Sequence, residues 1–304
     1  MQPILEVKNL TKKFNNFIAV DNISFCVNEG EVLGFLGPNG AGKTTTIQML
    51  LGVMTPTSGT ISYFGKQFEK YREEILKDVN YSSTYISLPA YFTVAECLQV
   101  FARLYEVPDK EKRIIKLLSE FEIERVKNKQ FYMCSAGEKT TVLLVKAFLN
   151  YPKIILLDEP TASLDPDIAV RVRRFLKKEK KEYNTSMLFT SHNMAEVEEM
   201  SDRIIILNHG KIIDENTPEK LANRITQCFL ELTIAKDAKK AEIFFKEKHI
   251  QYVQEKSRYR IALKEKDIAS FLSDITKENI IYEAISIDKP DLEDYFLQAI
   301  GVNT

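Results

Sequence analysis

A glycine-rich segment at residues 37–44 has the residue types that bind a chain of phosphates. It reads as a glycine, four residues and then Gly-Lys-Thr, which is the spacing of the P-loop motif. In this motif successive backbone N–H groups point at one anion, Lys43 would reach the β- and γ-phosphates, and the Thr44 hydroxyl would bind Mg²⁺. The residues expected to contact the phosphates are Gly37, Pro38, Asn39, Gly40, Ala41, Gly42, Lys43, Thr44 and Thr45.

Two carboxylates follow an apolar run further along the chain. Residues 154–157 are Ile-Ile-Leu-Leu, and Asp158 and Glu159 come directly after them. Such a run predicts a buried central strand, and open α/β sheets bind ligands at the carboxyl ends of their strands. Asp158 would hold Mg²⁺, directly or through water, and Glu159 would orient or deprotonate the water that attacks the γ-phosphate. The alternative is a solvated acidic pair at the end of a strand.

The segments around these residues predict the elements that would position them. Residues 31–36 read as a buried strand and 45–51 as a helix, so the glycine loop would lead into a helix N-terminus, which attracts anions. Residues 4–27 read as antiparallel strands with a turn at Asn15-Asn16. Residues 85–150 are mostly helical by pattern and begin with a capping box at 93–96.

Taken in order, these motifs resemble the ATP-binding subunits of ABC transporters. Over residues 1 to about 220 the chain carries the P-loop, a segment at 134–138 in the place of the family signature, the carboxylate pair, a D-loop at 163–165 and a switch histidine, His192. The resemblance implies catalytic roles for Lys43, Glu159 and His192. It also implies ATP contacts from Phe14, by stacking on adenine, and from Ser135, Gly137 and Asp165.

The sequence departs from the family pattern at two places. The signature reads Cys-Ser-Ala-Gly-Glu where the family has Leu-Ser-Gly-Gly-Gln, so Ala136 adds a methyl group and Glu138 a negative charge near the phosphate of a paired protomer. Both changes can weaken ATP-driven closure. Thr84 stands where the family has a glutamine that binds Mg²⁺, and its hydroxyl is a shorter metal ligand.

Composition is that of a water-soluble protein of more than one domain. The chain has 304 residues, 44% of them hydrophobic, and a formal net charge of −1, which does not favour nucleic acid as a partner. No apolar run approaches the roughly 20 residues of a membrane span, and the first residues do not read as a signal peptide. The four scattered cysteines predict reduced thiols in a cytoplasmic protein.

A basic stretch and the C-terminal region have no part in the motifs above. Residues 171–181 are rich in Lys and Arg, and read either as a nucleic-acid patch or, preferably, as a solvated helix face, since no aromatic residues interleave them. Residues 225–304 follow the order β-α-β-β-α-β of a ferredoxin-like fold, with a strand at 280–287 and a last helix at 292–297. Their ending resembles the C-terminal extension of ABC-2-type export ATPases. A dimerisation or regulatory role is preferred for them.

The sequence therefore predicts an α/β P-loop NTPase core of the ABC ATPase kind at 1–224, with antiparallel β and helical subdomains, and a small α+β ferredoxin-like domain at 225–304. The expected function is ATP hydrolysis, with Mg²⁺, that powers a membrane exporter. The expected partners are a separately encoded transmembrane permease and a second copy or related ATPase subunit, with no nucleic acid. The chain would lie in the cytoplasm, on the inner face of the cell membrane.

Two other kinds of protein with a P-loop are alternatives to an exporter ATPase. A soluble ABC ATPase that acts on DNA or the ribosome usually carries two cassettes or a coiled-coil insertion, and this chain has one cassette and neither feature. A small-molecule kinase with a P-loop has no need of the segments at 135–137 and 163–165. The cargo is not encoded in this chain, because its pathway lies in the membrane subunit.

Overall fold

The computed structural model describes residues 3–83, 87–162, 164–191, 193–225 and 227–301. The chain divides into two compact units, Met1–Pro218 and Glu219–Thr304. This division lies a few residues before the boundary expected at 224. Among the described residues, no helix is long and apolar enough to cross a membrane. All four cysteines are described and have free thiols.

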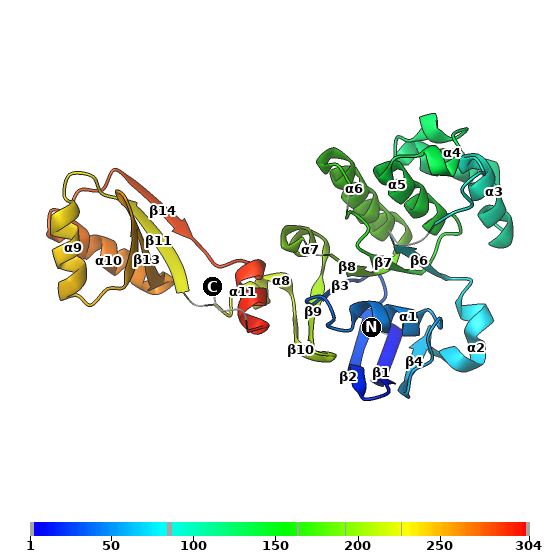
Figure 1. The fold of residues 1–304 in the computed structure, drawn as a ribbon, viewed down its shortest axis with the longest axis horizontal. Helices are drawn as coiled ribbons and strands as arrows, with labels where there is room; N and C mark the ends of the chain where they lie inside the picture. The colour runs from blue at the N-terminus through cyan, green and yellow to red at the C-terminus, as the bar shows by residue number, and fades with distance from the viewer. Residues whose placement is uncertain (1–2, 84–86, 163, 192, 226, 302–304) are drawn as a thin grey trace. The chain divides into compact units, whose positions relative to one another are not determined.

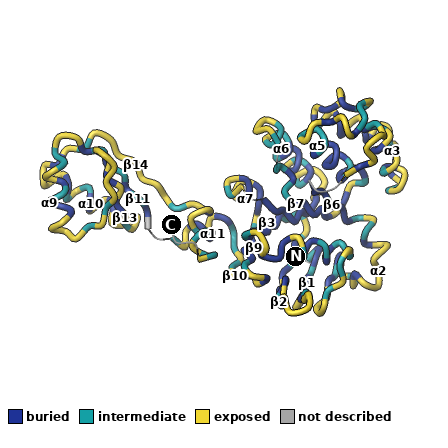
Figure 2. Tube along the Cα trace, in the orientation of Figure 1, coloured by how far each residue is buried: buried dark blue, intermediate teal, exposed yellow. Residues whose placement is uncertain are grey.

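A six-stranded sheet in the order β10-β9-β3-β8-β7-β6 lies at the centre of the first unit (Figure 1). Its strands are β3 (Val32–Leu36), β6 (Val79–Ser83), β7 (Ile154–Asp158), β8 (Ser186–Thr190), β9 (Arg203–Asn208) and β10 (Lys211–Asn216). Its strands run parallel except for β10, which pairs antiparallel with β9. Strands β3, β7 and β8 are buried along their whole length (Figure 2), as expected for apolar strands of a parallel sheet. The strands predicted at 31–36 and 154–157 are confirmed.

A second, antiparallel sheet has the order β2-β1-β4-β5. Its strands are β1 (Pro3–Phe14), β2 (Phe17–Asn28), β4 (Ser58–Tyr63) and β5 (Lys66–Gln67). The predicted turn at Asn15-Asn16 is confirmed, and Asn15 has a φ of 48°, in the left-handed region that asparagine tolerates. Helix α1 (Lys43–Leu50) lies with this sheet on one side of the parallel sheet (Figure 1). Side chains from both sheets and α1, such as Leu5, Phe35 and Ile47, form one buried core.

Helices cover the other side of the parallel sheet. The helices on this side are α3 (Val94–Leu104), α4 (Lys110–Glu120), α5 (Ala136–Ala147), α6 (Pro166–Tyr183) and α7 (Met194–Met200). Helix α2 (Phe68–Ile75) instead lies with the antiparallel strands β4 and β5 (Figure 1), and Phe68 and Ile75 belong to the core shared with that sheet. In Figure 1, α5 and α6 lie across the sheet from the antiparallel strands, and α3 and α4 lie beyond α5. The capping box predicted at 93–96 is confirmed: the Thr93 hydroxyl accepts from the N–H of Glu96, whose carboxylate accepts from the N–H of Thr93.

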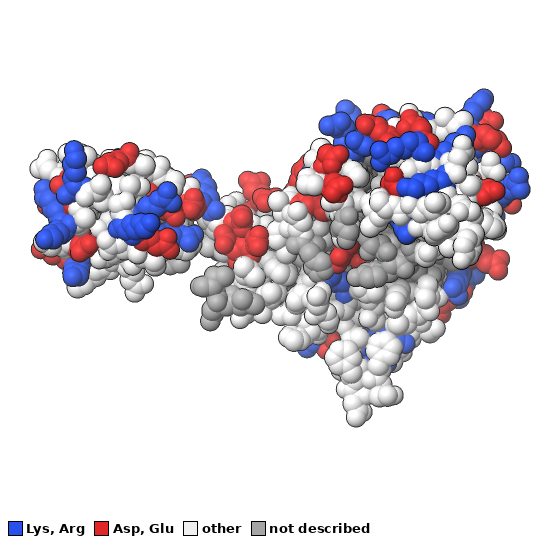
Figure 3. Space-filling view, turned by 45° about the horizontal axis from the view of Figure 1, so that its top comes forward, with Lys and Arg blue, Asp and Glu red and all other residues white. Residues whose placement is uncertain are grey.

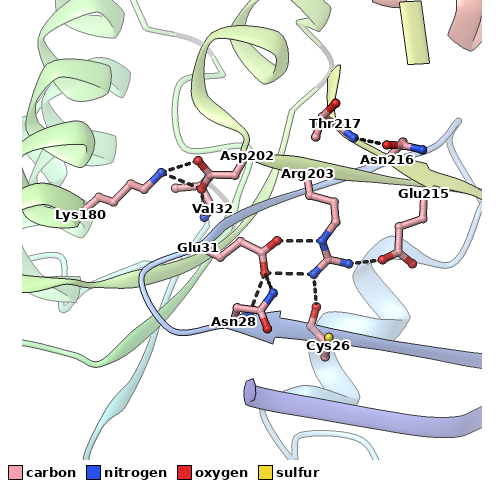
Figure 4. Close-up of polar contacts among 10 residues, drawn as sticks. All are labelled: Cys26, Asn28, Glu31, Val32, Lys180, Asp202, Arg203, Glu215, Asn216 and Thr217. Atoms are coloured by element: carbon pink, nitrogen blue, oxygen red, sulfur yellow. Dashed lines mark hydrogen bonds and ion pairs between the residues drawn. The ribbon is translucent and has the colours of Figure 1, made fainter. Parts of the chain in front are cut away.

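The Arg203 guanidinium joins both sheets at the amino end of β9 (Figure 4). It donates to the two carboxylate oxygens of Glu31, at 2.8 and 3.0 Å, to the Cys26 carbonyl at 2.7 Å and to the carboxylate of Glu215. The hydrogen bond to Glu31 is the main reason that the pKa of Arg203 lies above its ordinary value. Cys26 belongs to β2 and Glu215 to β10, so one side chain connects three strands.

Asp202 makes a second connection at the same end of the sheet (Figure 4). One of its carboxylate oxygens accepts from the N–H of Val32 at 2.8 Å, and Lys180 of α6 donates to both oxygens at 2.6 Å. Val32 begins β3, so these contacts fix the amino ends of the strands. The opposite, carboxyl ends of the strands lead into loops, and α/β sheets bind ligands at that edge.

The second unit contains a four-stranded antiparallel sheet in the order β12-β13-β11-β14. Its elements are α8 (Pro218–Ala222), β11 (Gln227–Thr233), α9 (Ala238–Glu247), β12 (Tyr252–Glu255), β13 (Arg258–Lys264), α10 (Glu265–Lys277), β14 (Ala284–Asp288) and α11 (Leu292–Ala299). From β11 to β14 the order is β-α-β-β-α-β. Strand β14 begins at Ala284 and not at Ile280, because the N–H of Ile280 bonds to Ile275 in α10 and that of Ile281 to the carboxylate of Asp237.

The basic stretch at 171–181 lies on α6, and several of its cations are paired with acids. Lys178 lies 2.7 Å from the Glu120 carboxylate, Lys177 lies 2.7 Å from that of Glu199, and Lys180 bonds to Asp202. Figure 3 shows Lys and Arg interspersed with Asp and Glu on the visible face of the first unit. This pattern is that of a solvated, ion-paired helix face.

Candidate functional site

The glycine loop at 37–42 connects β3 to α1, as the motif requires. Gly42 is the N-cap of α1 with a φ of 105°, and a Cβ atom there would lie 2.5 Å from the carbonyl oxygen of Ala19. Only glycine fits such a position. Within the described chain no side chain caps this helix, and its first turn holds no acid. The N-terminus of α1 is therefore suited to a negatively charged ligand.

The Lys43 side chain folds back over the loop. Its ammonium donates hydrogen bonds to the carbonyl oxygens of Gly37 and Pro38. Burial lowers the pKa of Lys43, while the nearby carboxylates of Glu159 and Asp158 raise it. Lys43 therefore lies between the loop and the two acids predicted from the sequence.

A single pocket brings together the two motifs that are more than a hundred residues apart in the sequence. The residues that line it are Phe17, Ala19, Asn39, Gly40, Ala41, Gly42, Lys43, Thr44, Thr45, Asp158 and Glu159. Gly37 and Pro38 are not among these lining residues, but their carbonyl oxygens accept hydrogen bonds from Lys43. Parallel pairing of β3, β8 and β7 aligns their carboxyl ends, which explains how the loop and the acids meet.

Asp158 is buried at the end of β7. One of its carboxylate oxygens accepts from the Thr190 hydroxyl at 2.7 Å, and the other is 3.5 Å from the hydroxyl of Tyr81. The pKa of Tyr81 is raised, chiefly because the ring is buried. Thr190 and Tyr81 are functional neighbours that sequence reasoning did not select. In the sequence Thr190 stands at the end of an apolar run, but only the structure shows that this strand, β8, lies next to β7.

Glu159 has an unusual backbone conformation. Its φ of 53° places a non-glycine residue in the left-handed region. The conformation is held by the backbone N–H, which donates to the Thr190 carbonyl and to the Thr190 hydroxyl, both at 3.1 Å. Backbone strain of this kind collects at functional sites. The left-handed conformation of Glu159 turns the chain sharply after β7, at the residue that lines the pocket.

The aromatic residue beside the glycine loop is Phe17. Of the residues that the structure describes, Phe17 and not Phe14 lines the pocket. The two face each other across the β1–β2 turn, and Phe17 is the more exposed, at 62% against 43%. The Lys12 ammonium lies 5.1 Å from the centroid of the Phe14 ring. The sequence-based prediction chose Phe14 because it occupies the family's position for the aromatic residue that stacks on adenine. Phe17, at the other end of the same turn, was a second candidate in the sequence.

The signature segment starts α5 and is capped by its own side chains. The Ser135 hydroxyl accepts from the N–H of Glu138 at 3.2 Å, and the Glu138 carboxylate accepts from the N–H of Ser135 at 2.9 Å. Glu138 is also paired with Lys129 at 2.8 Å and Arg125 at 3.4 Å. The bond from Lys129 is the main reason that the pKa of Glu138 lies below its usual range. The charge that replaces the family's glutamine is thus paired with two cations.

The D-loop segment approaches the signature within the same chain. A Cβ atom at Gly137 would lie 3.6 Å from the Leu164 side chain, in ordinary contact. Asp165 is exposed and is the N-cap of α6. Thr84, Ser163 and His192 lie outside the described residues.

Comparison with known proteins gives the same family throughout. The family model described as ABC transporter matches residues 20–162. The bacitracin transport ATP-binding protein BcrA of Bacillus licheniformis is 31% identical over 310 residues, which cover 100% of this chain and 99% of that protein. The Nod factor export ATP-binding protein I of Ralstonia nicotianae is 33% identical, over 74% of this chain and 71% of that protein.

Solved structures agree with these sequence relatives. An ATP-binding subunit of an ABC transporter is 29% identical, with a TM-score of 0.68 over 73% of this chain and 92% of that one. A dimeric ATP-binding cassette in a post-hydrolysis state, bound to ADP and Pi, is 25% identical, with a TM-score of 0.65 over 70% of this chain and 98% of that one.

Proposed function

This chain belongs to the ABC transporter family of ATP-binding proteins and is an ATPase, and we propose that it powers export of a cargo through a separate membrane protein. The observation that carries the proposal is the pocket in which the glycine loop meets Asp158 and Glu159. Relatives named for bacitracin transport and Nod factor export support the exporter role. The match to the bacitracin protein extends over the whole chain, including the second unit.

In this proposal the triphosphate of ATP lies over the glycine loop. The N-terminus of α1 and the Lys43 ammonium supply the positive charge that the phosphates need. The carbonyls of Gly37 and Pro38 keep Lys43 in place before ATP binds. Phe17, at the edge of the pocket, is the preferred stacking partner for the adenine ring, with Phe14 as its neighbour.

The residues present fit a magnesium ion beside the phosphates. The Thr44 hydroxyl and the Asp158 carboxylate line the same pocket. Among the described residues, no three His, Cys, Asp or Glu side chains are grouped to hold a metal on their own. Mg²⁺ commonly takes one or two protein oxygens and completes its shell with water and substrate phosphates. When bound, it neutralises charge that develops on the phosphates. Thr84 is retained as a proposed ligand from the sequence.

Glu159 is the proposed base that orients or deprotonates the attacking water, with His192 as its proposed switch partner. The Glu159 side chain lines the pocket next to Asp158. The Thr190 hydroxyl donates to the Asp158 carboxylate, and the Glu159 backbone is held at Thr190. Thr190 therefore holds Asp158 by its side chain and Glu159 by its backbone, an arrangement that suits different roles for the two acids as metal ligand and base.

A second ATPase protomer completes the site in the proposed cycle. Ser135 and Gly137 of one protomer, with Asp165, would contact the γ-phosphate of ATP held by the other. The partner is a second copy of this chain or a related subunit. The solved dimeric cassette with ADP and Pi supports pairing of this kind. ATP would close the pair, and hydrolysis would open it.

An exposed aromatic surface supports a membrane partner. Tyr91 and Tyr132 are 78% and 50% exposed, and their ring centroids lie 5.6 Å apart. Phe92 and Met133 beside them are also exposed, and the backbones of these two segments are hydrogen-bonded to each other. Met133 immediately precedes the signature segment, so a protein bound here would contact the segment that senses ATP. This surface is the proposed docking site for a separately encoded permease, which would hold the chain on the inner face of the cell membrane.

Vesicle binding tests this assignment. The full chain is mixed with inside-out membrane vesicles from the cells that make it, and bound protein is measured by flotation. A variant with both Tyr91→Ser and Tyr132→Ser should lose vesicle binding and keep its ATPase rate in solution. Ile213→Ser, at another exposed apolar residue, is the matched control. Three outcomes would refute the transporter role. They are equal vesicle binding by the two variants, binding to protein-free lipid vesicles, and cosedimentation with ribosomes or DNA in place of binding to the membrane vesicles.

The second unit, residues 219–304, is proposed to be an accessory domain for pairing or regulation. All the nucleotide motifs precede it. Its last helix, α11, buries Leu292 and Phe296 within the chain, and Tyr295 bonds to Arg224. Part of the apolar face of α11 is therefore covered within the chain, while Tyr295, Leu297 and Ala299 are partly exposed.

A further inference from the structure

Glu196 is a buried carboxylate that belongs to none of the nucleotide-binding motifs. Glu196 lies in α7 and is 3% exposed. One of its oxygens accepts two hydrogen bonds, from the Thr161 hydroxyl at 2.6 Å and from the Ser191 hydroxyl at 2.7 Å. A carboxylate that accepts two hydroxyl donors in a buried site makes strong, directional contacts.

The two hydroxyls belong to the two strand ends that form the catalytic site. Thr161 lies in the tight turn that follows Glu159, which is closed by a bond from the N–H of Ala162 to the Glu159 carbonyl at 3.2 Å. Ser191 follows β8, directly after Thr190, which holds the Glu159 backbone. Glu196 thus joins the turn after β7 to the loop after β8.

The neighbourhood of Glu196 holds its carboxylate in place. Its other oxygen lies 3.7 Å from the Arg173 guanidinium of α6. The backbone of the same helix turn is fixed as well, because the N–H of Glu196 donates to the Asn193 side chain at 3.2 Å. Glu159, Thr161, Ser191 and Glu196 all line one cavity beside the nucleotide pocket. A shift at Thr161 would therefore reach Glu159 through a turn of two residues.

We propose that Glu196 is a positioning residue for ATP hydrolysis, whose carboxylate holds the turn that carries Glu159 through the hydroxyls of Thr161 and Ser191. The inference rests on the proposed role of Glu159 as base. It predicts that breaking the Thr161–Glu196 bond slows the chemical step and leaves ATP binding unchanged. A small displacement of a catalytic group costs much in rate, because proton transfer requires near-ideal distance.

The test compares paired variants of the full chain in steady-state ATPase assays. Thr161→Val keeps the shape and removes the hydroxyl, and should lower kcat about tenfold while KM for ATP changes by less than about twofold. Thr161→Ser keeps the hydroxyl and should restore kcat. Glu196→Gln should lower kcat in the same way, and the Thr161→Val/Glu196→Gln double variant should be no slower than the slower single variant, because both break one contact.

Controls separate this inference from a general structural role and from the proposal for Glu159. Glu199→Gln changes an exposed glutamate of the same region that also contacts Arg173, and should leave kcat unchanged. Equal kcat for Thr161→Val and wild type would overturn the inference. So would a fall in ATP affinity or melting temperature, together with kcat, in both Thr161 variants. Glu159→Gln is assayed alongside: if it turns over at the wild-type rate, the role of Glu159 fails, whatever the Thr161 variants show.

Discussion

Two helices of this protein begin at segments that are expected to face phosphate, and they begin in opposite ways. Helix α1 starts at Gly42, without a side-chain cap in the described chain and without an acid in its first turn. Helix α5 starts at Ser135 with a complete capping box, and its first turn carries Glu138. The first helix therefore offers its N-terminus to a ligand, whereas the second satisfies its N-terminus with its own side chains.

The difference indicates what each helix can contribute to the nucleotide. A helix whose first N–H groups are not capped can hold a polyanion by itself. A self-capped helix has less to offer, and can contribute mainly the Ser135 hydroxyl hydrogen and the N–H of Gly137. This asymmetry suits a cycle in which one protomer holds ATP tightly at its own loop and the signature of the other adds weaker contacts on closure. Variants at the two helix starts can separate their contributions to nucleotide binding.

The largest effect is expected at the glycine loop. Lys43→Ala removes the charge that faces both the loop and the acids, so ATP affinity should fall at least about tenfold and turnover should be abolished. Isothermal titration with Mg-ATP measures the affinity. Lys139→Ala, near the start of α5, is the matched control and should keep single-protomer affinity. Unchanged affinity in Lys43→Ala would remove the loop from the site.

The next effect separates binding from chemistry. Glu159→Gln should slow turnover about a hundredfold or more, because the base is lost, while Asp158 and the loop still bind ATP. Closed pairs should then accumulate, since both helix starts remain engaged and nothing reopens them. Light scattering with and without ATP measures the pairing. Wild-type turnover in this variant would assign the base elsewhere.

A third variant asks whether the cap of α5 also serves the nucleotide. Ser135→Ala and Thr93→Ala each remove the serine or threonine of a capping box, from α5 and α3, and each should cost about 1 kcal/mol of stability. Only Ser135→Ala should also reduce ATP-dependent pairing, when both are made in the Glu159→Gln background. Equal pairing by the two would show that Ser135 is a cap and nothing more.

The smallest expected effect concerns the charge on the self-capped helix. Glu138 has a lowered pKa in the folded chain, chiefly because of Lys129, so its charge stabilises the fold above the pKa of the unfolded chain, about 4.5, and this stabilisation is lost as pH falls through the folded pKa. Wild type should therefore melt higher than Glu138→Gln at neutral pH, and the difference should vanish in acid. Melting curves from neutral pH to about pH 3 measure it. A difference that persists in acid would mean that the ion pairs are not its source.

The glycine loop and the acids could be predicted from the sequence because each is encoded locally. Glycine spacing, an apolar run and the residues after it decide backbone conformation within a few positions, so Gly37 to Thr45, Asp158 and Glu159 could be selected with the correct flanking elements. The capping box at Thr93 and the turn at Asn15-Asn16 are local in the same sense. Strand order was not local, and its consequence, that the loop and the acids share one pocket, was anticipated only through the general rule for parallel sheets.

Tertiary structure alone decided which neighbours support those residues. Phe17 and not Phe14 lies beside the loop because the pairing of β1 with β2 orients the turn. Lys129 and Arg125 balance Glu138 because a loop folds back on α5, and the sequence showed only an added negative charge. Thr190 and Glu196 support the Glu159 turn from more than thirty residues away. Contacts between distant segments depend on the packing of whole elements, and no short stretch of sequence specifies them.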